Sequence, residues 1–191
     1  ARDYSPLVLI MVAVFIAIFV IGAATAPNFL TVLNIKTILR DAAIVGIMAI
    51  GLTFVTLSGN FFLLSMKETA ALSIMAFATS MSAGYGFELS FLFTMVIAMA
   101  AGAIQGLLIG LGGNPIVVTL GAAGLFFGIS SWWSDNLVVS FRRPHGAEWL
   151  GSGSFLGLPN ITIAFIIIAI FAEFVLRRTS FGRQVYLVGS N

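Results

Sequence analysis

The sequence predicts an all-α integral membrane protein, a polytopic helical bundle forming a single transmembrane domain over residues 1–191. Two observations carry this prediction: 60% of the residues are hydrophobic and only 8% are charged, and the mean hydropathy is +1.10. A soluble domain carries about 25% charged residues, because water must wet its surface. The net charge of +2 is too small to indicate a nucleic-acid partner. Because the chain has no cysteine, it gives no indication of redox compartment.

Six apolar runs predict six membrane-spanning helices, since about 20 apolar residues cross the hydrocarbon core. Some runs are shorter than this, so we expect those helices to be bent, re-entrant or buried in protein. Residues 32–41, between the first two runs, mix apolar and charged side chains, and we expect a short interfacial helix there. The predicted spans are 7–24, 42–57, 63–81, 89–111, 116–133 and 161–176.

An even number of spans places both ends of the chain on the same side of the membrane. If that side is the cytoplasm, lysine and arginine are almost evenly divided between the two sides. The arginine pair that follows the last span, Arg177 and Arg178, decides in favour of cytoplasmic ends.

The fourth predicted span carries small residues at every fourth position, so they share one helix face. Small residues let another helix approach closely. We interpret this face as helix packing inside the bundle, and a dimer face is the alternative. The residues are Ala98, Gly102, Gly106 and Gly110, and the fifth span repeats the pattern with Gly121, Gly124 and Gly128.

The sequence offers little for catalysis. It has one histidine and no zinc-protease, nucleophile-elbow or phosphate-loop motif. That histidine, His145, follows Arg142 and Arg143 in a polar stretch, and we interpret it as a solvated surface residue. We therefore expect neither a catalytic residue nor a metal site, and the chain is not predicted to be an enzyme.

Lys67 and Glu68 fall inside the third apolar run, although a charge at the centre of a span costs about 2.5–3.5 kcal/mol. In one interpretation both lie at the membrane interface, where Lys67 extends its amine toward water. In the other, Asn60, Phe61 and Phe62 form an unwound break, and the two charges line a translocation path behind it.

Four further residues have simple structural interpretations. Gln105, in the fourth span, is expected to form an interhelical hydrogen bond and is included in the candidate path. Glu173 is expected to pair with Arg177 one helical turn away. Trp132 and Trp133 are expected to anchor the outer interface.

Several motifs occur in a familiar order along nearly the whole chain. The most specific covers 177–183 (Arg-Arg-Thr-Ser-Phe-Gly-Arg) and is followed by Tyr186 and by Gly-Ser-Asn at 189–191. Shorter motifs lie at 27–31, 51–59, 114–121 and 156–159. With these motifs the chain resembles the permease subunit of ribose-type bacterial ABC importers, the monosaccharide branch of a family that includes autoinducer-2 and branched-chain amino-acid permeases. Many members carry Gly-Gly-Ile-Asp-Leu-Ser-Val-Gly after the second span, whereas this chain has Gly-Asn-Phe-Phe-Leu-Leu-Ser-Met at 59–66 and lacks the aspartate.

The resemblance implies a multi-pass protein of the bacterial inner membrane, in which these are the first six of about ten spans. It implies that a cytoplasmic loop, which couples the permease to the ATPase, begins at Thr179, Phe181, Gly182 and Arg183. The implied partners are a second permease subunit, identical or different, ATP-binding cassette subunits that hold ATP and magnesium, and a periplasmic solute-binding protein. No cofactor is expected in this chain.

The expected function is passage of a small polar solute, a sugar, that the binding protein delivers. One alternative is a secondary transporter driven by H⁺ or Na⁺, with Lys67 and Glu68 as its coupling pair. A membrane scaffold without transport activity is a further alternative, suggested by the glycine faces alone.

Overall fold

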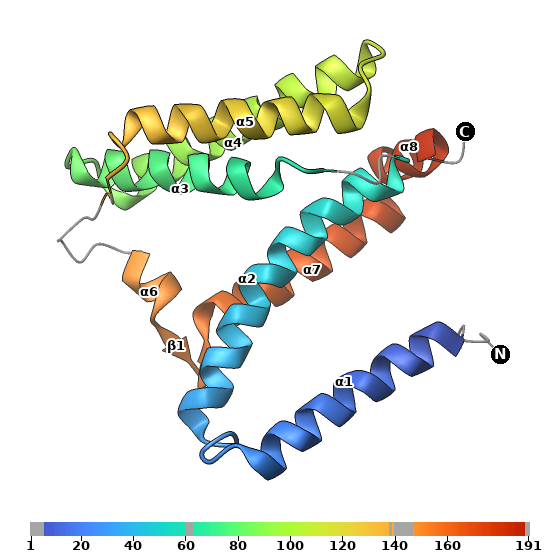
Figure 1. The fold of residues 1–191 in the computed structure, drawn as a ribbon, viewed down its shortest axis with the longest axis vertical. Coiled ribbons are helices and arrows are strands. Elements are labelled where there is room, and N and C mark those ends of the chain that lie inside the picture. The colour runs from blue at the N-terminus through green and yellow to red at the C-terminus, as the bar shows by residue number, and fades with distance from the viewer. Residues whose placement is uncertain (1–5, 60–62, 138, 140–146, 190–191) are drawn as a thin grey trace.

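The computed structural model describes residues 6–59, 63–137, 139 and 147–189, and almost all of its regular structure is helical (Figure 1). A two-stranded antiparallel hairpin pairs Phe155 with Leu158. The elements are α1 (Pro6–Thr25), α2 (Val32–Leu57), α3 (Met66–Ser82), α4 (Phe87–Gly110), α5 (Pro115–Trp133), α6 (Ala147–Gly151), β1 (Ser154–Phe155), β2 (Leu158–Pro159), α7 (Asn160–Arg178) and α8 (Ser180–Gly189).

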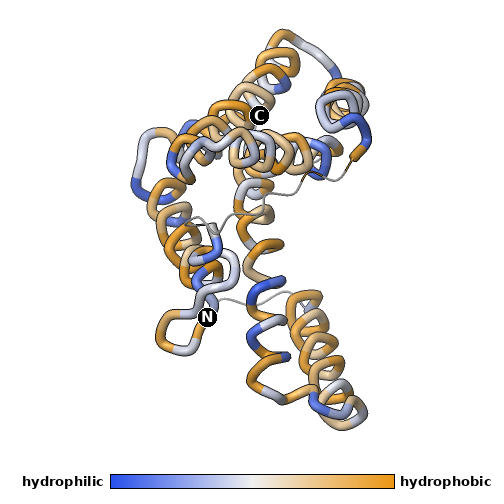
Figure 2. Tube along the Cα trace, turned by 90° about the vertical axis from the view of Figure 1, so that its left-hand side faces the viewer, coloured by the Kyte–Doolittle hydropathy of each residue, from blue (hydrophilic) through white to orange (hydrophobic). Residues whose placement is uncertain are grey.

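Within the described ranges, five helices are long and apolar enough to cross a membrane: α1, α2, α4, α5 and α7. The third predicted span, 63–81, is helical from Met66 onward, but at 17 residues α3 is shorter than these five helices. The prediction of an all-α membrane protein is confirmed. Large apolar side chains remain exposed along most helices, and Figure 2 shows hydrophobic helix bodies with hydrophilic residues gathered near turns and helix ends.

The structure corrects the prediction for residues 32–57. The expected interfacial helix and the second span form one continuous helix of 26 residues, α2. Thr31 begins it, because its side chain accepts a hydrogen bond from the backbone N–H of Asn34. No glycine or proline lies between Lys36 and Ala42 to interrupt the helix, so the charged residues form its first turns.

The helices form two groups, with α1 apart from both (Figure 1). One group contains α3, α4 and α5, with α3 in contact with both others, and the second is the pair α2 and α7, with α8 across one end. The two helices pack closely at Gly46 of α2. A Cβ added at this glycine would lie only 2.5 Å from the Phe165 ring of α7. Nearer the start of both helices, Thr162 Oγ1 donates a hydrogen bond to the Leu39 carbonyl over 3.2 Å.

No residue of α1 is buried. The turn that follows α1 folds back onto the helix through Phe29. The ring of Phe29 lies edge-on to that of Phe19, with centroids 5.3 Å apart. The same ring lies over Gly22, where a Cβ would approach it to 2.8 Å. A hydrophobic contact of the helix end with the following turn thus fixes where α1 stops, while the helix surface is left for lipid or for other protein.

Candidate functional site

A cavity of about 580 Å³ lies between α2 and the group of α3, α4 and α5. Four helices contribute to its wall, and the lining residues that the structure describes include no charged side chain. Pockets of about 300–1,000 Å³ hold small molecules, so this one has a suitable size for a small solute. Its polar lining residues are Ser58, Thr69, Gln105 and Thr119.

Gln105 is the central polar group of this wall, and it is only 4% exposed. Its Nε2 donates to the Ala101 carbonyl over 3.1 Å, and its Oε1 accepts a hydrogen bond from the hydroxyl of Ser65. Ser65 is fully buried and begins α3. The predicted interhelical hydrogen bond of Gln105 is therefore confirmed, and it joins the start of α3 to the inner face of α4.

The hydroxyl groups around the cavity are oriented by their own helices. Thr119 Oγ1 donates to the Pro115 carbonyl over 2.8 Å, and Thr69 Oγ1 donates to the Ser65 carbonyl over 2.8 Å. Ser58 Oγ donates to the Val55 carbonyl over 2.7 Å. Because each hydroxyl uses its only proton on the backbone, its oxygen lone pairs remain to accept hydrogen bonds. The wall is thus suited to a solute that donates hydrogen bonds and carries no charge.

Gly102, Gly106 and Gly110 line the same cavity. A Cβ at any of these positions would have no described atom within 4 Å, so no described part of the chain packs on this face. Because glycine has no side chain, these three positions leave the cavity wide on the α4 side. The predicted packing role stays a prediction, and it requires a neighbour other than the described residues.

Lys67 and Glu68 lie in the first turn of α3, where Lys67 is exposed and Glu68 is half-buried. The cavity is lined instead by Met66, Thr69 and Ala70, which lie on one face of this helix. The path role of the two charges stays a prediction. Asn60, Phe61 and Phe62 lie outside the described residues, although Ser58 and Leu63 on either side of them both line the cavity.

The segment in which the resemblance places the start of the coupling loop forms a helix, α8, and its coupling role stays a prediction. Thr179 joins it to α7, because its Oγ1 donates to the Val175 carbonyl over 2.6 Å and accepts from the backbone N–H of Gly182 over 3.2 Å. Arg183 Nη2 donates to Ser180 Oγ over 3.1 Å. These contacts cap the first turn of α8 and turn the chain sharply after α7.

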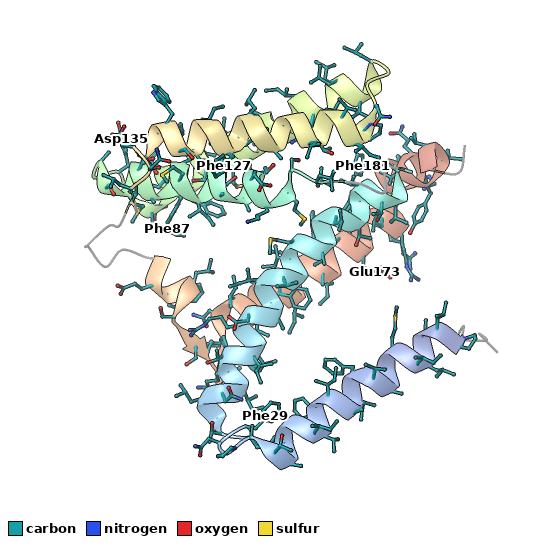
Figure 3. All side chains as sticks on the ribbon, viewed as in Figure 1. Phe29, Phe87, Phe127, Asp135, Glu173 and Phe181 are labelled. Carbon is teal, nitrogen blue, oxygen red and sulfur yellow. The ribbon has the colours of Figure 1, made fainter. Side chains whose placement is uncertain are left out.

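Two glycines let α8 lie directly against its neighbours. A Cβ on Gly182 would overlap the backbone of Leu176 in α7, and a Cβ on Gly189 would overlap the carbonyl of Leu57 in α2. The two glycines are seven positions apart, about two helical turns, so they share one face of the helix. Phe181 lies where the ends of α2 and α8 meet (Figure 3).

The remaining sequence predictions concern the surface. Glu173 and Arg177 form the expected ion pair, with Oε1 and Nε 2.5 Å apart. Trp132 is exposed, and Trp133 contacts Phe93 edge-on at 6.4 Å between ring centroids. Within the ranges described, no group of three or more histidine, aspartate or glutamate residues could hold a metal. Arg142, Arg143 and His145 are outside those ranges.

Sequence reasoning missed Ser65 and Thr119. Both are fully buried; Thr119 lines the cavity, and Ser65 donates a hydrogen bond to Gln105, which lines it. A single serine or threonine in an apolar run has no pattern that distinguishes it. Thr119 has one usable signal, because it lies one turn after Asn114-Pro115, and Asn114 caps α5 by accepting from Ile116 and Val117 N–H.

Residues 34–191 match the family model described as branched-chain amino acid transport system / permease component. The autoinducer 2 import system permease of Salmonella typhimurium is 29% identical over 177 residues, covering 92% of this chain and 50% of the relative. The ribose import permease of Bacillus subtilis is 32% identical over 179 residues, covering 93% and 55%. The L-arabinose ABC transporter permease of Azospirillum brasilense is 30% identical over 182 residues, covering 95% and 53%. The chain therefore spans about half the length of these relatives. No solved structure matches it.

Proposed function

Because this chain belongs to the family of branched-chain amino acid transport system permease components, we propose that it forms part of the translocation path of an ATP-driven bacterial importer. The cavity beside Gln105 carries the proposal, since it combines the size of a small-molecule site with a polar, uncharged wall. The chain supplies the path, and the energy comes from a separate ATP-hydrolysing subunit.

The proposed cargo is a neutral, hydroxyl-rich solute of the sugar class. Relatives are named for import of ribose, L-arabinose and autoinducer 2. The hydroxyl oxygens of Ser58 and Thr69, which are half-buried, would accept hydrogen bonds from such a molecule. A charged solute would find no opposite charge in the described wall, and burying an uncompensated charge is costly.

The proposed partners follow from the two ends of the molecule. Figure 1 shows α8 on the same side as the N-terminal end of α1, opposite the β1–β2 hairpin. With Arg177 and Arg178 leading into α8, we assign this side to the cytoplasm, and α8 to contact with the ATP-binding cassette subunits. A periplasmic solute-binding protein would dock on the opposite side, a second permease subunit would complete the path, and the assembly would lie in the bacterial inner membrane.

In this proposal the pore exchanges between inward-open and outward-open states. ATP on the partner subunits biases that equilibrium by binding one state better than the other. Lys67 and Glu68 are not among the residues that line the cavity, which favours a pore driven from outside the chain over one driven by ions through this charged pair.

Reconstitution of the full-length permease with its ATPase subunits and binding protein tests this function. We expect uptake of radiolabelled ribose or L-arabinose to require ATP and to persist when H⁺ and Na⁺ gradients are collapsed. Uptake that follows an ion gradient without ATP would refute the proposal. So would a lack of any uptake difference between active ATPase subunits and subunits with an inactivated nucleotide site.

Two variants test the assigned sites. Gln105→Leu removes the central polar group of the cavity and is expected to lower uptake about tenfold, the effect of about 1.4 kcal/mol. Thr94→Val is the matched control, because Thr94 lies on the same helix and bonds only to the Ser90 carbonyl of its own turn among described residues. Equal uptake by the two variants would remove Gln105 from the path.

Arg183 tests the ATPase contact, because its side chain is exposed on α8. We expect Arg183→Ala to reduce stimulation of ATP hydrolysis by the loaded binding protein while leaving the protein folded. Full stimulation in this variant would show that the contact lies elsewhere.

A further inference from the structure

We propose that the last turn of α2, residues 54–58, is the mechanical link between α8 and the cavity, and that Phe54 and Leu57 are its positioning residues. The inference rests on the proposed function, since it assigns α8 as the element that the ATPase moves. It adds the route by which such a movement reaches the solute.

The first observation concerns the face of this turn that meets α8. The rings of Phe54 and Phe181 lie with centroids 6.4 Å apart, tilted by 34°. At the other end of α8, Gly189 lies against the carbonyl of Leu57 so closely that no Cβ would fit. The last turn of α2 therefore contacts α8 at two places, near the start of α8 and near its end. A rigid movement of α8 must displace this turn.

The second observation concerns the adjacent face of the same turn. Val55 and Ser58 line the cavity. Positions 54 and 57 lie on one side of an α-helix, and positions 55 and 58 lie about 100° farther around it. A single helical turn thus separates α8 from the cavity, and no other element of the described chain contributes both contacts.

The turn is held together by its own hydrogen bonds. The Ser58 backbone N–H donates to the Phe54 carbonyl over 3.3 Å, and Ser58 Oγ donates to the Val55 carbonyl over 2.7 Å. Gly59 N–H donates to the Thr56 carbonyl over 3.1 Å. These bonds connect the residues that meet α8 to those that line the cavity, so the turn is expected to move as a unit.

The helix that precedes α8 in the chain does not itself reach the cavity. α8 follows α7 directly through Thr179 and packs on it through Gly182. However, no residue of α7 is among the described residues that line the cavity. A movement of α8 therefore reaches the solute through a noncovalent contact with α2.

The chain has no cysteine, which makes a single reporter thiol possible at Ser58. The full-length permease, with any cysteine outside residues 1–191 replaced, is reconstituted with its ATPase subunits, and labelling of Ser58→Cys by a small thiol reagent is timed. We expect ATP with vanadate to change the labelling rate about threefold or more, because the two states expose the cavity differently.

Adding Phe181→Ala should abolish that change while ATP hydrolysis continues. Phe174→Ala is the matched control, because Phe174 is 58% exposed and Phe181 56%, and the described residues include no ring partner for Phe174. Phe54→Leu provides a second test from the α2 side, since it removes the ring pair and keeps a helix-forming apolar residue.

The outcomes separate the link from the proposed function. An ATP response that survives both Phe181→Ala and Phe54→Leu overturns the link, as does ATP-driven uptake with an unresponsive Ser58→Cys reporter. If the unsubstituted protein shows no ATP-driven uptake at all, the proposed function fails instead. Loss of the response in both variants, with the Phe174→Ala control intact, supports the link.

Discussion

The hydrogen bond between Ser65 and Gln105 gives the most direct test of the site. Both side chains are buried, and they lie 40 residues apart in the chain. Replacing Gln105 by leucine would leave the Ser65 hydroxyl without its acceptor, and an unpaired buried hydroxyl costs about 1–3 kcal/mol. Interhelical hydrogen bonds measured in a membrane protein average about 0.6 kcal/mol and reach about 1.7. Because neither partner of this bond is open to solvent, we expect a coupling energy of about 1 kcal/mol or more.

The assay is a double-mutant cycle on the full-length permease. Equilibrium unfolding in mixed micelles is measured for the unsubstituted protein, Ser65→Ala, Gln105→Leu and the double variant. The double variant should lose less stability than the sum of the single variants, by the coupling energy. Thr94→Val combined with Gln105→Leu is the control pair, and its effects should add. Additive effects in the Ser65 pair as well would refute the inferred hydrogen bond.

Three further predictions concern single contacts of the fold. Gly182→Ala should destabilise the protein by about 1–3 kcal/mol in thermal unfolding, because its Cβ would overlap the Leu176 backbone, whereas Gly128→Ala, which faces open space, should not. Asn114→Ala should cost about 1 kcal/mol by removing the cap of α5, and Asn114→Asp should restore most of that loss in the same measurement. Glu173→Gln should change the unfolding free energy by less than about 1 kcal/mol, since the ion pair is exposed, and a larger loss would contradict this account.

The helices were largely predictable because the length of an apolar run in the sequence indicates a membrane-spanning helix. An apolar run of about 20 residues has no favourable place in water, and α1, α4, α5 and α7 each begin and end within two residues of their predicted spans. The true start of α2 was not predictable in this way. Lys36 and Arg40 resemble the composition of an interfacial segment, yet charge does not end a helix as glycine or proline does.

The site was predictable only where one residue stood out. Gln105 is conspicuous in an apolar run, and it lines the cavity. Its partner Ser65 is an ordinary residue whose role depends on the three-dimensional approach of α3 to α4. Likewise, the resemblance places Gly182 at the start of a coupling loop, but it gives no sign that this glycine lets α8 pack against α7. Contacts between distant segments leave no local pattern in a sequence.

The contrast between α1 and α3 bears on how the protein enters the bilayer during synthesis. α1 is apolar throughout its 20 residues, so we expect the translocon to release it into lipid without help. α3 has 17 residues, a length of about 25 Å against a hydrocarbon layer of about 30 Å, and begins with Lys67 and Glu68. We therefore expect nascent α3 to await the emergence of α4 and α5, so that this bundle inserts as one hairpin-like unit rather than helix by helix.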